Sequence, residues 1–135
     1  MKPRYAPSPT LLLHFAVVLL GAALTLGFTT KVRLAPQPAA APAPDIRLNA
    51  AAPVRMAIGP GAVLPAGSRW RAVGALAQGT VYRPLNHVVL LQGQRVDEAW
   101  PVVSGGWLQG FFLPAEARFA PVRDAVPLPL AGARA

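Results

Sequence analysis

The stretch WPVVSGGWLQGFFL, residues 100–113, decides the fold. Gly105 and Gly106 at its centre permit the positive φ values that a tight hairpin turn needs. Most of the residues on both sides are β-branched, aromatic or aliphatic, as is typical of strands. We therefore predict an antiparallel hairpin that turns at these two glycines. We also predict a bulge or bend at Gly110, and a place for Pro101 at a sheet edge or at the start of a strand.

Short apolar runs of the same kind recur on both sides of this hairpin, separated by turn residues such as Gly, Pro and Asn. Strands are predicted over residues 69–73, 80–83, 87–91, 99–103, 107–113 and 118–122. Short strands at intervals of about 8 to 12 residues are typical of meanders and small barrels. The predicted fold class is therefore mainly β, with a small antiparallel meander or SH3-like barrel over residues 67–124.

An apolar run without Asp, Glu, Lys or Arg occupies residues 11–28, with Lys2 and Arg4 before it and Lys31 and Arg33 after it. A helix of this length spans roughly 27 Å, close to the hydrocarbon thickness of a bilayer. We predict a short leader over residues 1–10 and one transmembrane helix over residues 11–30. A cleaved signal peptide is the alternative interpretation.

The orientation of this helix is less strongly encoded, because two basic side chains lie on each side of the run. A short leader followed by a helix and the main domain is the usual order of a signal anchor, which puts the leader in the cytoplasm. Small residues lie four apart in the run, Gly21 with Thr25 and Ala23 with Gly27. This spacing lets two helices approach closely, so a homodimer through the anchor is a further hypothesis.

Proline and alanine dominate residues 31–66, which are predicted to form an extended linker between anchor and domain. Fully extended, about thirty such residues reach roughly 100 Å. Only residues 45–48 and 54–58 have the pattern of short strands. Residues 125–135, which contain Pro127 and Pro129, are predicted to be a flexible tail.

The charge and cysteine content exclude several kinds of function. The net charge is +8, yet residues 68–124 carry six arginines against four carboxylates. The excess therefore lies beside the anchor, in the linker and in the tail, which fits anionic lipid headgroups better than a nucleic acid. The absence of cysteine excludes disulfides, thiolate metal sites and thiol catalysis.

Few polar residues are candidates for chemistry. His87 has no second histidine or cysteine near it, which disfavours a zinc site. Asp97 and Glu98 are adjacent, so in a strand they point to opposite faces and form no facing acid–base pair. Ser104 precedes two glycines and fits a turn. The sequence therefore predicts no enzyme, no metal and no cofactor.

Aromatic residues are the better functional candidates. Phe111 and Phe112 are consecutive, so a strand places them on opposite faces, and we expect one of them or Trp107 to be exposed. Tyr82 and Arg83 form a second candidate, because exposed aromatics beside arginine are enriched at interfaces. The predicted partner-binding residues are Trp107, Phe111, Phe112, Tyr82 and Arg83.

The order of leader, helix, proline-rich segment and small β domain resembles single-pass accessory subunits of bacterial envelope machines of the secretion, pilus or conjugation type. The resemblance concerns organisation and carries no residue roles. It implies an inner-membrane protein with a periplasmic C-terminal domain that docks a protein partner of the envelope. A tethered module that binds cell-wall glycans is the alternative.

Overall fold

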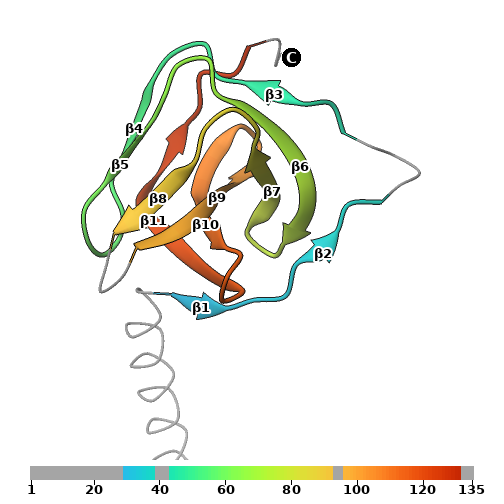
Figure 1. The fold of residues 1–135 in the computed structure, drawn as a ribbon, viewed down its shortest axis with the longest axis vertical. Coiled ribbons are helices and arrows are strands. Elements are labelled where there is room, and N and C mark those ends of the chain that lie inside the picture. The colour runs from blue at the N-terminus through green and yellow to red at the C-terminus, as the bar shows by residue number, and fades with distance from the viewer. Residues whose placement is uncertain (1–28, 39–42, 93–95, 132–135) are drawn as a thin grey trace, which may run out of the picture.

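The computed structural model describes residues 29–38, 43–92 and 96–131. They form a mainly β structure, as predicted, in which one antiparallel sheet curls into half a barrel (Figure 1). Among them, no helix is long and apolar enough to cross a membrane. The predicted leader and anchor lie outside the described residues except for Thr29 and Thr30, and Thr30 begins the first strand.

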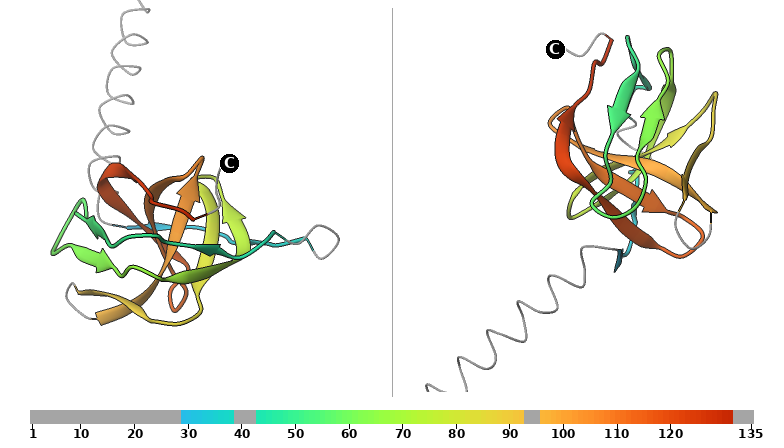
Figure 2. Two further views of the ribbon diagram at one scale, coloured as in Figure 1. Left: turned by 90° about the horizontal axis from the view of Figure 1, so that it is seen from above. Right: turned by 90° about the vertical axis from the view of Figure 1, so that its left-hand side faces the viewer.

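The strands are β1 (Thr30–Lys31), β2 (Ala35–Pro36), β3 (Ile46–Arg47), β4 (Ala52–Val54), β5 (Ala62–Leu64), β6 (Arg69–Leu76), β7 (Gly79–Pro84), β8 (Val89–Gln92), β9 (Val96–Ser104), β10 (Trp107–Leu113) and β11 (Arg118–Pro127). The main sheet has the order β1-β11-β10-β9-β7-β6-β2, with β3 paired to β6 and β8 paired to β9. β4 and β5 form a separate hairpin, which Figure 2 shows between β11 and β8. The six strands predicted from the sequence overlap β6 to β11.

The predicted hairpin is the centre of the sheet. β9 and β10 pair antiparallel with Trp107 opposite Ser104, and the turn residues Gly105 and Gly106 have φ values of 59° and 83°. The register shifts between Leu108 and Gly110, so the predicted bulge is confirmed. Both features were predictable because they depend on local backbone conformation.

Gly110 also permits a close approach between strands. A Cβ atom built there would collide with the carbonyl oxygen of Ala120 and the ring of Phe119, both on β11. The bulge therefore lets β10 lie against the aromatic ring of its neighbour, and any side chain at this position would push the two strands apart.

The prediction for Pro101 is wrong, because Pro101 lies inside β9 and opposite Phe111 of β10. On its other side, β9 pairs with β8 as far as Ala99 and with β7 from Val102 onward. Pro101 falls in the change from one neighbour to the other. A residue without an amide hydrogen is tolerated there because no ladder hydrogen bond is required of it.

Residues 31–66 differ from the linker expected of them, because the described part of this segment contains strands that pair with the domain. β1 pairs with β11, and both β2 and β3 pair with β6. Leu48 is buried, and so are the alternate side chains Ala52, Val54 and Met56. Proline favours extended backbone, which suits short edge strands as well as free chain.

The curled sheet has an apolar cluster on each face. Phe111 belongs to the larger cluster, which includes Leu48, Trp70 and the β4–β5 side chains. Phe112 belongs to the smaller one with Val81, Val102 and Phe119, against which Val32 and Leu34 pack. The chain between β1 and β2 therefore covers a face of the sheet that a free linker would leave open.

The C-terminal segment also differs from the expected flexible tail. β11 continues to Pro127, and the amide of Leu128 donates to the carbonyl of Gly106 at 2.9 Å. Leu130 forms a bridge with Leu48, and the amide of Ala131 donates to the carbonyl of Arg47. Residues 125–131 are therefore part of the folded domain, and residues 132–135 lie outside the described part.

Candidate partner-binding groove

The structure separates the predicted partner-binding residues by burial. Phe111 and Phe112 are 0% and 5% exposed, because both faces of the sheet are covered. Trp107, in contrast, is 48% exposed at the start of β10. Tyr82 is half-buried, with its ring centroid 6.4 Å from that of Trp70, and burial raises the pKa of its hydroxyl. Of these five residues, only Trp107 and Arg83 are exposed.

These residues do not form one surface. β7 pairs with β9 at Thr80 opposite Val103 and at Val81 opposite Val102, close to the hairpin turn. Tyr82 and Arg83 lie farther along β7, away from the turn beside which Trp107 stands. Tyr82 and Arg83 are therefore not next to the exposed Trp107.

The polar candidates are likewise dispersed. The Trp100 indole nitrogen donates to a Glu98 carboxylate oxygen at 3.0 Å. Asp97 is opposite Leu91 in the β8–β9 ladder, one residue before Glu98 and so on the other face. In the part of the chain that the structure describes, no group of three His, Cys, Asp or Glu residues is placed to hold a metal ion.

Exposed apolar side chains gather at a place that the sequence analysis did not single out. The large hydrophobic side chains exposed in the described residues are Ile58, Val63, Val88, Leu90, Val96 and Trp107, with exposed fractions between 48% and 66%. Val63 lies on β5, Leu90 lies on β8 and Val88 directly precedes β8. Ile58 lies in the turn between β4 and β5, and Val96 is opposite Gln92 of β8. A concentration of this kind marks an interaction surface more clearly than single exposed residues do.

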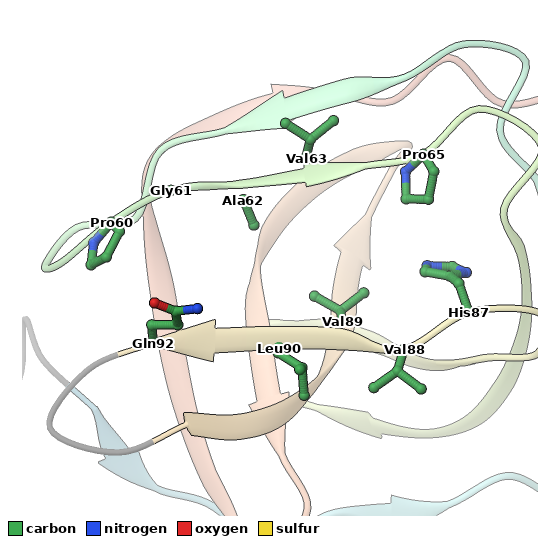
Figure 3. A pocket seen from close by; sticks show the side chains of 10 residues that line it. All are labelled: Pro60, Gly61, Ala62, Val63, Pro65, His87, Val88, Val89, Leu90 and Gln92. Carbon is green, nitrogen blue, oxygen red and sulfur yellow. The ribbon is translucent and has the colours of Figure 1, made fainter.

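β5 and β8 form the walls of a groove of about 410 Å³. It is lined by Pro60, Gly61, Ala62, Val63, Pro65, His87, Val88, Val89, Leu90 and Gln92. In Figure 3, Ala62 extends from β5 and Val89 from β8 toward the space between the two strands. Val63 and Leu90, 64% and 52% exposed, form its apolar rims.

The two walls are strand edges that carry no partner on their facing sides. Within the described residues, β8 pairs only with β9, and β5 pairs only with β4. No backbone hydrogen bond joins β5 to β8 in that part of the chain. In an antiparallel strand with one neighbour, alternate amide and carbonyl groups point toward the free side. The groove therefore combines apolar side chains with unpaired backbone groups.

Hydrogen bonds hold the walls together at one end of the groove. The Asn86 side chain donates to the carbonyl of Gly67 at 3.0 Å and accepts from the amide of Arg69 at 3.0 Å. The Ser68 hydroxyl donates to the carbonyl of Pro65, which ends the β5 wall. Asn86 thus ties the turn after β5 to the turn before β8, and the spacing of the walls is fixed at this end.

His87 lies at the same end. Its Nδ1 is 3.3 Å from the Asn86 side-chain oxygen, and its Nε2 is buried without a hydrogen-bond partner in the described structure. Burial lowers the pKa of the imidazole, because desolvation disfavours the charged ring. The neutral ring adds to the apolar character of the groove and makes it less suited to an anion at this end.

One signal in the sequence could have identified this site. Residues 88–91 are Val-Val-Leu-Leu, whereas a strand with one solvent-exposed face alternates apolar and polar residues. Four apolar residues in a row require a second apolar face, and the structure exposes Val88 and Leu90 on it. The other wall was hidden because Val63 belongs to the segment expected to be a linker.

Comparison of the chain with models of protein families, with curated proteins and with solved structures finds no match in any of the three.

Proposed function

We propose that this chain is a membrane-anchored accessory subunit of a bacterial envelope assembly, with a β domain that docks a protein partner in the groove between β5 and β8. The observation that carries the proposal is that the exposed apolar side chains Val63, Val88 and Leu90 line a groove between two strands whose facing edges are unpaired. Isolated apolar residues on a surface are ordinary, but a lined groove with free backbone groups is a recognised mode of protein binding.

The location of the protein is part of the same proposal. Residues 11–28 form the transmembrane helix, the leader lies in the cytoplasm and the domain lies in the periplasm. The domain has the size of an SH3-like barrel, with the β4–β5 hairpin along its open side. The sequence supports the anchor through its length and through the basic residues on both sides.

The lining of the groove favours a polypeptide over a glycan. Sugar-binding grooves present aromatic faces, on which the pyranose rings stack. The residues that line this groove are five aliphatic residues, two prolines, one glycine, one glutamine and one histidine. Trp107, the exposed tryptophan of the described residues, lies outside it.

Site-specific photocrosslinking in living cells tests this function. A benzophenone amino acid replaces Leu90, Trp107 or Ala115 in the full-length chain, one position at a time. Ala115 is an exposed position in the turn between β10 and β11 and measures background. We expect a discrete protein adduct from position 90 alone, lost when Val63 is changed to Asp in the same chain. An adduct from position 107 alone would move the docking surface to the hairpin, and wall fragments at position 90 would replace the protein partner by a glycan.

A further inference from the structure

The groove adjoins a second, smaller hollow with a different character. Gly61 lines both of them, and the second hollow has a volume of about 250 Å³. Arg55 and Arg123 line it together with Met56, Ala57 and Gly59. An extended chain that leaves the groove at its Gly61 end therefore meets a hollow that two arginines line.

The two arginines are held opposite each other by backbone contacts. Met56 forms a bridge with Val122, and the Arg123 amide donates to the Arg55 carbonyl at 2.7 Å. This geometry puts Arg55 and Arg123 on the same face as cross-strand neighbours, where like charges destabilise the pairing. Both side chains are exposed, and in the described residues neither has an ion pair or a side-chain hydrogen bond.

In the described residues, no carboxylate forms an ion pair with Arg55 or Arg123. Glu98, opposite Leu90 of β8, accepts a hydrogen bond from Trp100. Asp45 is bound by Arg71 at 3.0 Å on another part of the sheet. A domain that keeps two unpaired arginines side by side, at the end of an apolar groove, is complementary to a chain that carries a carboxylate after its apolar residues.

From this arrangement we propose that the groove binds an extended segment of the partner as an added strand along β8, with a carboxylate of that segment held by Arg55 and Arg123. The inference rests on the proposed docking function and names the chemistry of the partner. The carboxylate belongs to an Asp or Glu side chain or to a chain end, and the test below separates these sources.

The dimensions of β8 limit the length of the segment. β8 has four residues, Val89–Gln92, which span about 13 Å at roughly 3.3 Å per residue. Parts of β5 lie within 8 Å of β8, whereas a strand added between them needs a separation of about 9.5 Å. The β4–β5 hairpin therefore has to move outward before a segment of about four residues pairs with the free edge of β8. Alternate side chains of the segment face the buried Val89 and the half-buried Ala62, so every second residue is expected to be apolar and of modest size.

The photoadduct at position 90 provides the test, because mass spectrometry of the digested adduct locates the crosslinked residue in the partner. We expect it in a stretch of alternating apolar residues with an Asp, a Glu or a chain end within a few residues. A synthetic peptide of that stretch, labelled at the end remote from the carboxylate, is then titrated with the full-length protein in detergent micelles. Peptides with the acidic side chain amidated, or with the chain end amidated, show which carboxylate is bound.

Two matched double variants measure the contribution of the arginines. Arg55→Gln with Arg123→Gln removes the pair beside the groove. Arg47→Gln with Arg69→Gln removes another exposed pair of arginines, which stand opposite each other on β3 and β6 and line neither hollow. We expect the first variant to weaken peptide binding about tenfold or more, the order expected for a charge-assisted contact, and the second to change it less than twofold.

A charge exchange completes the experiment. Arg55→Glu with Arg123→Glu should abolish binding of the acidic peptide, and a peptide with Lys in place of the carboxylate should restore it. Equal affinities for both double Gln variants, or an adduct on a folded surface without an extended acidic stretch, would overturn this inference but leave partner docking intact. No protein adduct at position 90 would overturn the docking function itself.

Discussion

Replacing Phe111 or Phe112 by Ala tests whether the two aromatics belong to the core. Both are at most 5% exposed, and Phe→Ala substitutions at such sites cost about 3–5 kcal/mol in the free energy of unfolding. Trp107 serves as the control, because it is 48% exposed. Its replacement by Ala should cost about 1 kcal/mol or less.

Urea denaturation of the full-length protein in detergent micelles, followed by far-ultraviolet circular dichroism, measures these differences. With a slope of about 2 kcal/mol per molar urea, a loss of about 4 kcal/mol lowers the unfolding midpoint by about 2 M. A domain with a total stability of about 5–15 kcal/mol would be left marginal or only moderately stable. The control should shift the midpoint by about 0.5 M or less.

The result for Phe112 tests whether the smaller cluster is formed, since its burial depends on Val32 and Leu34 from the segment expected to be a linker. If Phe112→Ala leaves the midpoint unchanged while Phe111→Ala lowers it, the smaller cluster is not formed in solution. The reasoning about the second covered face would then be refuted, and Phe112 would return to the candidates for partner binding.

Other substitutions test single contacts. Gly110→Ala should destabilise the domain by about 1–3 kcal/mol, measured by the same denaturation, because its Cβ would collide with the carbonyl of Ala120. His87 has a lowered pKa, so the unfolded chain takes up its proton first, and stability should fall as the pH drops from about 6.5 through the folded-state pKa. In melting temperatures measured over a pH series, His87→Gln should reduce this decrease below about pH 6.5. The hydrogen bond from Arg71 lowers the pKa of Asp45, so the ionised Asp45 stabilises the fold above about pH 4, and this stabilisation is lost as the pH falls through the lowered pKa. Asp45→Asn should remove this loss of stability at low pH from the same series.

The hairpin was predictable from the sequence because its determinants are local. Gly105 and Gly106 adopt the positive φ values that the turn requires, and Gly110 marks the bulge. Such features depend on the conformations open to one or two residues. The mainly β class follows from the same reasoning, since each run from β6 to β11 has its own turn signals.

The strands before β6 were not predictable in the same way, because their partners are distant in the sequence. Ile46 pairs with Trp70, and Leu48 forms a bridge with Leu130. An alternation of apolar residues at positions 52, 54 and 56 is present in the sequence, but the prolines around it favour extended backbone whether or not a partner strand exists. Only the partner decides between strand and free linker.

The candidate site was hidden for a related reason. Each wall alone is unremarkable in the sequence, since β5 has three residues and β8 has four. The two walls come together only in the folded chain, where Asn86 donates a hydrogen bond to Gly67, 19 residues earlier. The aromatic residues near the hairpin were the more visible candidates, yet aromatic side chains are also the usual material of a small core, and Phe111 and Phe112 serve there.

The position of β1 has a consequence for how the proposed anchor holds the domain. Thr30 pairs with Phe119 two residues after the apolar run ends at position 28, a distance of roughly 7 Å of extended chain. Lengthening this connection by detaching β1 would also remove Val32 from the cluster around Phe112 and Phe119. With residues 11–28 in the membrane, as proposed, the domain would stay close to the bilayer unless its smaller core were exposed. The segment proposed to bind in the groove would then have to be presented near the membrane surface, rather than at the roughly 100 Å that a free linker would have reached.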